Sequence, residues 1–158
     1  SPATKVPGKP TFDRKGNPID HIHTGADNEP WSYGEDVERI VRKYIAVREA
    51  MRPYTRDLFA QAHADGQPVA RGLFYEFPDD EAAADEYLFG PDLLVAPVTE
   101  LGARSREVYL PGDESTTWTN LHDGAEYAGG QTVIVDAPLD VLPLFARNGA
   151  DHALNGMI

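Results

Sequence analysis

Two histidines near the start of the chain are spaced so that their side chains can act together. His21 and His23 lie in a polar stretch that is rich in proline and glycine. Alternate residues of an extended segment point the same way, so two imidazoles at this spacing could share a metal ion. The nearest candidates for a third ligand are Asp20 and Asp27. Because no third ligand is obvious beyond these two aspartates, we interpret the stretch as a solvated loop and predict no metal site.

Carboxylates gather in one short segment, where paired acids could perform acid–base catalysis. They are Asp79, Asp80, Glu81, Asp85 and Glu86. The segment is also rich in alanine and follows Pro78, so we interpret it as a solvated acidic loop. An independent small hydrolase would need two carboxylates within catalytic range around a pocket. No pair is singled out by its sequence context, and we predict no catalytic residue here.

Aromatic side chains offer a second kind of chemistry, the stacking of sugar rings. One group consists of Phe74, Tyr75, Phe77, Tyr87 and Phe89. At strand spacing such residues more often form the core. Trp118 and Tyr127 could mark an exposed carbohydrate-binding face, although sandwich strands also need large core residues. A non-catalytic carbohydrate-binding or structural module therefore remains an alternative function, which solvent exposure of Trp118 and Tyr127 would favour.

The charge balance limits the kinds of partner. The 158 residues carry a formal net charge of −12 at pH 7, and an acidic surface repels phosphate backbones and anionic lipids. We expect neither nucleic acid nor membrane as a partner, and we interpret Arg104 and Arg106 as surface or interdomain contacts. The chain has no cysteine, and residues 1–10 lack the apolar stretch of a signal peptide. Localisation stays open, with the cytoplasm favoured.

Periodicity divides the sequence into a helical part and an all-β part. Residues 1–30 read as loop because prolines and glycines interrupt every regular period. Ser32 and Glu35 form a capping box for a helix that Pro53 ends or kinks, and a second helix ends at Asp65-Gly66. Residues 69–77 have the character of a strand. Short strand signals separated by turns follow at 93–98, 106–110, 116–121, 126–128, 132–135 and 142–147. This pattern is typical of an antiparallel sandwich or barrel.

Four stretches carry a recognisable pattern. They are Tyr44-Ile-Ala-Val-Arg-Glu-Ala-Met-Arg-Pro-Tyr54, Gly66-Gln-Pro-Val-Ala-Arg-Gly-Leu-Phe-Tyr-Glu-Phe-Pro78, Tyr87-Leu-Phe-Gly-Pro-Asp-Leu-Leu-Val-Ala-Pro-Val98, and a run from Val108-Tyr-Leu-Pro111 to Leu142-Pro-Leu-Phe-Ala-Arg-Asn-Gly149. Together they resemble the end of the barrel and the proximal C-terminal domain of glycoside hydrolase family 31. The resemblance covers roughly residues 19–150.

The resemblance implies a fold in two parts, because members of this family have a (β/α)8 barrel followed by β-sandwich domains. Residues 1–78 would be the C-terminal piece of the barrel, with strand eight at 69–77. Residues 87–158 would be the proximal C-terminal β-sandwich domain. The expected fold class is an α+β fragment, in which the end of a (β/α)8 barrel precedes an antiparallel β-sandwich. Active sites in such barrels lie at the C-terminal ends of the strands, so Asp79 or Asp80 would line the rim.

The catalytic pair of the family has no counterpart in the chain. Retaining glycosidases use two carboxylates about 5–5.5 Å apart, one as nucleophile and one as acid and base. The family's nucleophile lies in a Trp-x-Asp-Met-Asn-Glu type motif, and neither Trp31 nor Trp118 has such a context. The acid/base aspartate lies upstream of the matching region. His23 falls where the family has a histidine that hydrogen-bonds the sugar, which implies a substrate-binding role, although His21 stands where the family has arginine.

The resemblance implies a parent enzyme that hydrolyses O-glycosyl bonds of α-glucosides or α-xylosides with retention, without metal or organic cofactor. The isolated chain is predicted to be inactive because the carboxylate pair is missing. The expected partners are the carbohydrate substrate, through the parent enzyme, and the remainder of the barrel or another copy of the chain. Either protein partner, or packing against the β domain, would cover the apolar stripe Val37–Tyr44–Ile45 and the predicted strand Leu73–Phe77, which would otherwise promote aggregation.

Overall fold

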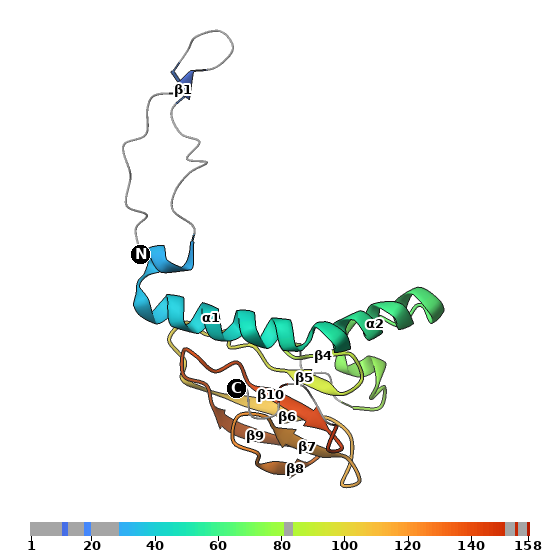
Figure 1. Cartoon of the computed structure of the whole chain (residues 1–158). Coiled ribbons are helices and arrows are strands. Elements are labelled where there is room, and N and C mark those ends of the chain that lie inside the picture. Colours follow the sequence, from blue (N-terminus) through green and yellow to red (C-terminus); the bar gives the residue numbers. More distant parts are fainter. Residues whose placement is uncertain (1–10, 13–17, 20–28, 81–83, 151–153, 155–157) are drawn as a thin grey trace. The chain divides into compact units, whose positions relative to one another are not determined.

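A computed structural model describes residues 11–12, 18–19, 29–80, 84–150, 154 and 158. The chain divides into two compact units, Ser1–Arg42 and Lys43–Ile158. The first unit contains an antiparallel pair, β1 (Thr11–Phe12) and β2 (Pro18–Ile19), the 3₁₀ helix Pro30–Tyr33 and the start of α1 (Figure 1). The second unit holds the rest of α1 and all remaining described elements.

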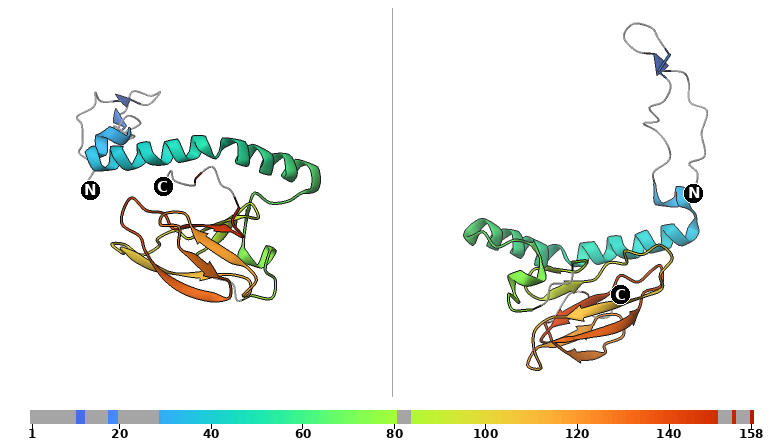
Figure 2. Two further views of the ribbon diagram at one scale, coloured as in Figure 1. Left: turned by 60° about the horizontal axis from the view of Figure 1, so that its bottom comes forward. Right: turned by 180° about the vertical axis from the view of Figure 1, so that it is seen from behind.

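Two helices follow one another along the chain and lie nearly end to end (Figures 1 and 2). They are α1 (Glu35–Ala50) and α2 (Arg52–Asp65). Pro53 lies in the first turn of α2, where its missing N–H removes no helical hydrogen bond. Gly66 ends α2 in the left-handed conformation with a φ of 78°. The predicted break at Pro53 and the predicted end at Gly66 are confirmed. Ser32, in contrast, lies in the 3₁₀ helix and does not cap α1.

Two antiparallel sheets make up most of the second unit. The large sheet has the order β3-β4-β5-β10-β7-β8, and the small sheet is β6-β9. The strands are β3 (Ala70–Arg71), β4 (Tyr87–Phe89), β5 (Leu93–Val95), β6 (Ser105–Leu110), β7 (Thr117–Asn120), β8 (Glu126–Ala128), β9 (Gln131–Asp136) and β10 (Leu144–Arg147). The strands predicted from residue 93 onward are confirmed, with small changes at their ends.

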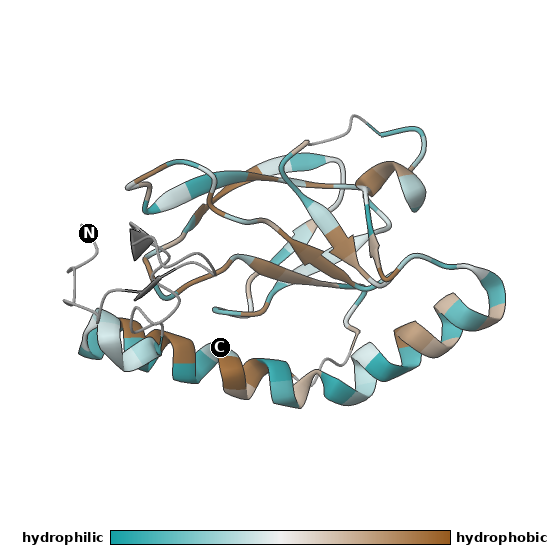
Figure 3. Ribbon diagram, turned by 90° about the horizontal axis from the view of Figure 1, so that it is seen from above, coloured by the Kyte–Doolittle hydropathy of each residue, from teal (hydrophilic) through white to brown (hydrophobic). Residues whose placement is uncertain are grey.

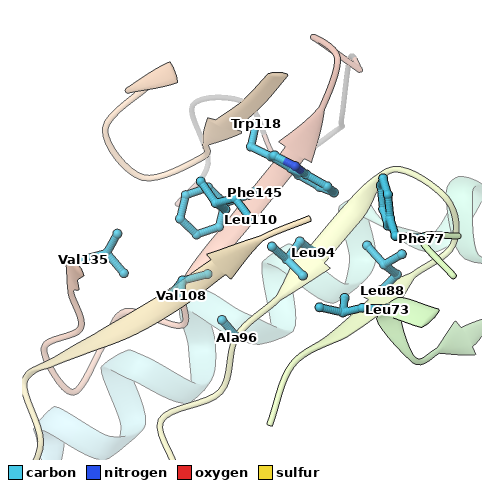
Figure 4. Packing of buried hydrophobic residues seen from close by; sticks show 10 residues of the cluster. All are labelled: Leu73, Phe77, Leu88, Leu94, Ala96, Val108, Leu110, Trp118, Val135 and Phe145. Atoms are coloured by element: carbon cyan, nitrogen blue, oxygen red, sulfur yellow. The ribbon is translucent and has the colours of Figure 1, made fainter. Parts of the chain in front are cut away.

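The two sheets share one hydrophobic core, as in a β-sandwich. Its buried residues are Leu73, Phe77, Leu88, Leu94, Ala96, Val108, Leu110, Trp118, Val135 and Phe145. Figure 4 shows this core extending from Phe77 and Trp118 at one end to Val135 at the other. Buried and partly buried residues alternate in β7 and in the last part of β6, which places one face of each strand in the core.

The opposite face of the large sheet packs against a helix. Val47 of α1 is buried together with Leu93 of β5 and Leu144 of β10. The Tyr44 hydroxyl donates a hydrogen bond of 3.1 Å to the Asp140 carbonyl and accepts one of 2.8 Å from the N–H of Leu142. The second unit therefore has a helix, a large sheet and a small sheet in successive layers. Figure 3 shows apolar and polar residues alternating along the helices, while apolar residues predominate in several strands.

The predicted strand at 69–77 is wrong for most of its length. Only Ala70 and Arg71 are in strand conformation, and Leu73–Tyr75 form a 3₁₀ helix. In a strand Leu73, Tyr75 and Phe77 would face one way, but Leu73 and Phe77 are buried and Tyr75 is 43% exposed. The N–H of Phe77 donates a 2.9 Å hydrogen bond to the Leu73 carbonyl. A helical turn thus puts two residues four apart on the same side.

The predicted division into residues 1–78 and 87–158 stays a prediction. Within the described residues, β3 pairs with β4, with Ala70 opposite Phe89 and Arg71 opposite Leu88. The segment before residue 78 and the segment after residue 87 therefore contribute to the same sheet. None of the helices in the described part of the chain is both long and apolar enough to cross a membrane.

Candidate functional site

The candidate sugar-binding residue, His23, lies outside the described residues, as do His21 and Glu81. Its substrate-binding role therefore stays a prediction. The remaining candidates fall into two groups of described residues. One is the turn formed by residues 73–80, and the other surrounds Glu86 at the start of β4.

The turn of residues 73–80 follows directly on β3 and folds over the core face of the large sheet. Leu73 is 2% exposed and Phe77 is 8% exposed, and the Phe77 ring lies 6.2 Å from the Trp118 ring. Phe74, in contrast, is 64% exposed. The turn thus has an inner side anchored in the sandwich and an outer side that presents aromatic surface.

Glu76, in the middle of the turn, lies between two arginines. Its Oε1 atom accepts a hydrogen bond of 2.5 Å from Nη1 of Arg71, and its Oε2 atom lies 3.6 Å from Nη1 of Arg147. The Arg71 side chain is only 4% exposed, while those of Glu76 and Arg147 are 22% and 24% exposed. Nε of Arg71 also donates to the Pro68 carbonyl at 2.9 Å. Both carboxylate oxygens of Glu76 thus take part in structural ion pairs.

The far end of the turn is held by Asp80. Its Oδ2 atom accepts a 2.6 Å hydrogen bond from the N–H of Gly112. Gly112 has a φ of +95°, a conformation that other L-residues rarely adopt, and a Cβ atom there would meet the Thr116 side chain. Beside the turn lies a shallow hollow of about 370 Å³, whose lining includes Asp79, Asp80 and Arg147.

A second carboxylate, Glu86, is buried inside the sandwich. Its Oε1 atom accepts a 2.9 Å hydrogen bond from the N–H of Tyr109 and lies 3.0 Å from Nη2 of Arg106. Among the described residues its buried Oε2 atom has no hydrogen-bond partner. Burial raises the pKa of Glu86, against the opposing effects of the Tyr109 N–H and the Arg106 charge. Arg106 also contacts Asp85 at 3.2 Å and donates to the Pro97 carbonyl.

The prediction of a solvated acidic loop is therefore wrong for Glu86, which is 6% exposed, and Asp80 also has a defined partner. Sequence reasoning missed the arrangement of Glu76 between Arg71 and Arg147 as well. The one available signal was a charged residue between two aromatics in Tyr75-Glu-Phe77. Within the described residues no group of three His, Cys, Asp or Glu side chains could hold a metal ion.

The aromatic residues divide into buried and exposed groups. Trp118 is fully buried, with 0% exposure, and its Nε1–H donates a 2.8 Å hydrogen bond to the Pro111 carbonyl. Tyr127 packs against the core, and its ring lies edge-on to that of Phe145 at 6.2 Å. Core positions are confirmed for Trp118 and Phe77, and Tyr127 is partly buried against the core. The prediction of core positions is wrong for Phe74, Tyr75 and Tyr87, which are exposed. The sheet face that a carbohydrate-binding module would have needed is therefore internal.

Comparisons with known proteins agree with this architecture. Residues 66–150, more than half of the chain, match the family model described as the glycosyl hydrolase family 31 C-terminal domain. The chain is 40% identical over 129 residues to alpha-glucosidase 2 of Bacillus thermoamyloliquefaciens, which covers 80% of the chain and 16% of that protein. It is 35% identical over 143 residues to an alpha-xylosidase of Saccharolobus solfataricus, covering 88% of the chain and 19% of that protein.

Solved structures give the same result. A GH31 alpha-xylosidase from a soil metagenome, complexed with xylose, superposes with a TM-score of 0.74 at 46% identity, over 84% of this chain and 20% of that one. The chain thus spans less than a quarter of the length of each of these three proteins. The α+β architecture, with its antiparallel sheets, matches these enzymes. On the strength of the match over residues 66–150, the chain belongs to glycosyl hydrolase family 31.

Proposed function

We propose that the chain is the C-terminal part of a retaining α-glycosidase that hydrolyses O-glycosyl bonds of α-glucosides or α-xylosides. One observation carries the proposal: residues 66–150 match the C-terminal domain of a family whose members similar to this chain include an alpha-glucosidase and an alpha-xylosidase. The chain spans 16% and 19% of those two relatives. The catalytic machinery would then lie in the rest of the enzyme.

The chain alone is proposed to be inactive. Retention requires two carboxylates about 5–5.5 Å apart that remain available to the sugar. Glu76 is paired with Arg71, Glu86 is buried beside Arg106, and Asp80 accepts a backbone N–H. Because these carboxylates are engaged in structural contacts, we assign the sandwich a structural, non-catalytic role. The two-carboxylate mechanism needs neither a metal nor an organic cofactor.

The proposed place of the chain in the enzyme is the end of the barrel and the sandwich that buttresses it. In this arrangement α1 and α2 belong to the outer helical layer, and residues 69–71 form the end of strand eight. The turn of residues 73–80 then lies at the C-terminal end of that strand, where active sites of such barrels are found. His23 would lie in the loop after strand seven and donate or accept a hydrogen bond to the sugar.

The rest of the barrel is the proposed protein partner, because the second unit exposes large apolar side chains that a barrel would cover. On the helices Ile45 is 54% exposed and Phe59 is 61% exposed, and on the turn Phe74 is 64% exposed. Apolar surface of this kind favours association. In the absence of the rest of the barrel, another copy of the chain would take its place.

The proposal is tested by assaying the chain and the full-length enzyme side by side with aryl α-glucosides and aryl α-xylosides. Hydrolysis by the full-length enzyme alone is the expected result. Activity of this chain by itself would overturn the proposal and direct attention to Asp79, Asp80 and His23. The preference between the two sugars assigns the substrate.

His23 is tested separately in the full-length enzyme. Loss of one hydrogen bond to the sugar in the transition state should lower kcat/KM of His23→Ala about ten-fold or more. The matched control is His63→Ala, which removes an exposed histidine of α2. Equal activity of the two variants would show that His23 does not bind the substrate.

A further inference from the structure

The two arginines that hold Glu76 come from strands that are not neighbours. Arg71 ends β3 and Arg147 ends β10, and two strands, β4 and β5, lie between them. With neighbouring strands about 4.8 Å apart, the two backbones are roughly 14 Å apart. A single carboxylate can reach both arginines only if it lies over the sheet between them.

Both arginines point to the sandwich face of the large sheet. Arg71 is opposite Leu88 in β4, and Arg147 is opposite Trp118 in β7. Directly paired residues of an antiparallel sheet share a face, and both Leu88 and Trp118 belong to the shared core. Glu76 therefore lies over the sandwich face of the large sheet, at one end of this core.

The neighbours of Glu76 in sequence hold the same two arginines. The Arg71 guanidinium carbon lies 5.1 Å from the centre of the Tyr75 ring, and that of Arg147 lies 4.5 Å from the centre of the Phe77 ring. Both distances are within the range of cation–π attraction. We call these five residues, Arg71, Tyr75, Glu76, Phe77 and Arg147, the Glu76 clamp. The clamp restrains three consecutive residues of the turn at once.

The clamp and the Asp80 contact leave only the outer side of the turn free. The middle of the turn is restrained by the clamp, and its far end by the 2.6 Å hydrogen bond from Gly112 to Asp80. Four residues of the turn are exposed: Tyr75, which belongs to the clamp, and Phe74, Pro78 and Asp79, which do not. A turn held at two points has a more defined outer surface than a turn held at one.

We propose that Glu76 is a positioning residue for the glycosidase reaction, and that the Glu76 clamp makes the sandwich set the shape of the substrate rim. The inference rests on the proposed function, in which residues 69–71 end strand eight and the turn lies at the catalytic end of the barrel. Phe74 and Asp79 are the side chains that would then contact the α-linked glycoside, by stacking and by hydrogen bonding to a hydroxyl. Because Arg147 belongs to β10 and contacts Glu76, it fixes the positions of Phe74 and Asp79 relative to β10.

The experiment uses the full-length enzyme with Glu76→Gln, Arg147→Met and both together. Each single change should raise KM about five-fold or more for the α-glycoside, because the rim that binds substrate is no longer held. The KM of the double variant should be no higher than that of the more affected single variant, because both changes disrupt the same clamp. Concentrations of active enzyme are set by active-site titration, so loss of folded protein does not enter the comparison.

The matched control is Glu126→Gln, which neutralises an exposed glutamate of β8 in the same sheet. If the clamp were merely structural, the Glu76 variant would lower the yield or melting temperature and leave KM unchanged, and that result would overturn the inference. Should Arg147→Met fail to fold, Arg147→Lys keeps the charge but not the planar stacking on Phe77, and its KM should also rise. Absence of hydrolysis by the unmodified full-length enzyme would contradict the proposed function itself.

Discussion

Glu76 and Glu86 are both glutamates held by arginines in the same sandwich, yet their surroundings differ. Glu76 uses both oxygens, one for Arg71 and one for Arg147, and its side chain is 22% exposed. The Glu86 side chain is 2% exposed, and one of its oxygens has no hydrogen-bond partner among the described residues. A glutamate held by arginine is therefore found in a partly exposed environment and in a buried one.

The difference assigns the two glutamates to different tasks. Glu86 immediately precedes β4 of the large sheet and binds Tyr109 and Arg106 of β6 in the small sheet, so it joins the two sheets from within. Glu76 joins a surface turn to the end of the sandwich. We call the surroundings of Glu86 the inner site and those of Glu76 the outer site. A buried charge is costly unless it is paired, so the inner site should govern stability and the outer site should govern the shape of the turn.

The largest expected effect is on the inner site. Arg106→Ala leaves Glu86 buried without its counter-charge and should lower the free energy of unfolding by about 3 kcal/mol at pH 7. Arg147→Ala should cost about 1 kcal/mol, because Glu76 keeps Arg71 and is partly solvated. Urea unfolding of both variants, followed by far-UV circular dichroism, gives the two values. Equal losses would remove the distinction between the sites.

The control for both arginine variants is Arg104→Ala. The Arg104 side chain is exposed and donates to the carbonyl of its neighbour Ala103 at 2.8 Å. Its removal should change the free energy of unfolding by no more than about 0.5 kcal/mol. A larger loss would mean that residues 97–104 contribute to stability in a way that these contacts do not explain.

The next largest effect concerns the second anchor of the turn. Asp80→Ala removes the charged acceptor of the Gly112 N–H and should lower the free energy of unfolding by about 1.5 kcal/mol. Asp79→Ala, one residue earlier and exposed, is the matched control and should be nearly neutral in the same measurement. If the two variants are equally stable, the turn is anchored by the Glu76 clamp alone.

A smaller effect measures the outer pair directly. A double-mutant cycle with Glu76→Gln and Arg147→Met should give a coupling free energy of about 0.5–1 kcal/mol, because the 3.6 Å pair is partly exposed. The corresponding cycle with Glu86→Gln and Arg106→Met should give a larger coupling free energy, since that pair is buried. The reverse order would contradict the assignment of Glu86 to the sandwich interior.

Much of the fold follows from local signals in the sequence. Pro53 and Gly66 mark the ends of helical segments because one lacks an N–H and the other adopts positive φ. The short strands after residue 93 are separated by turn residues, and their alternation is visible in the sequence. The segment 69–77 was wrongly predicted as a strand because β-propensity describes fit to a half-buried surface. The apolar spacing of Leu73 and Phe77 suits a helical turn equally well.

The site was less predictable, because its contacts join residues far apart in sequence. Nothing local to Glu76 indicates that Arg147, 71 residues later, lies beside it. Similarly, Glu86 sits in an acidic run that reads as solvated, and its burial depends on Tyr109 and Arg106 in another sheet. The family resemblance carried the expectation of function, and for His23 it remains the basis of the prediction.

The smallest expected effect is the pH dependence of the inner site. Burial raises the pKa of Glu86 in the folded state, so folding favours its protonated form. Its contribution to stability is therefore fully present below its ordinary pKa of 4.5 and is lost as the pH rises through the folded value. Wild type minus Glu86→Gln, measured as free energy of unfolding from pH 4 to pH 7, should fall as the pH rises. The matched variant Asp113→Asn should give the opposite slope below pH 4, because hydrogen bonds from Ser115 lower the pKa of Asp113. A rising difference for Glu86 would mean that the Arg106 charge outweighs burial at this site.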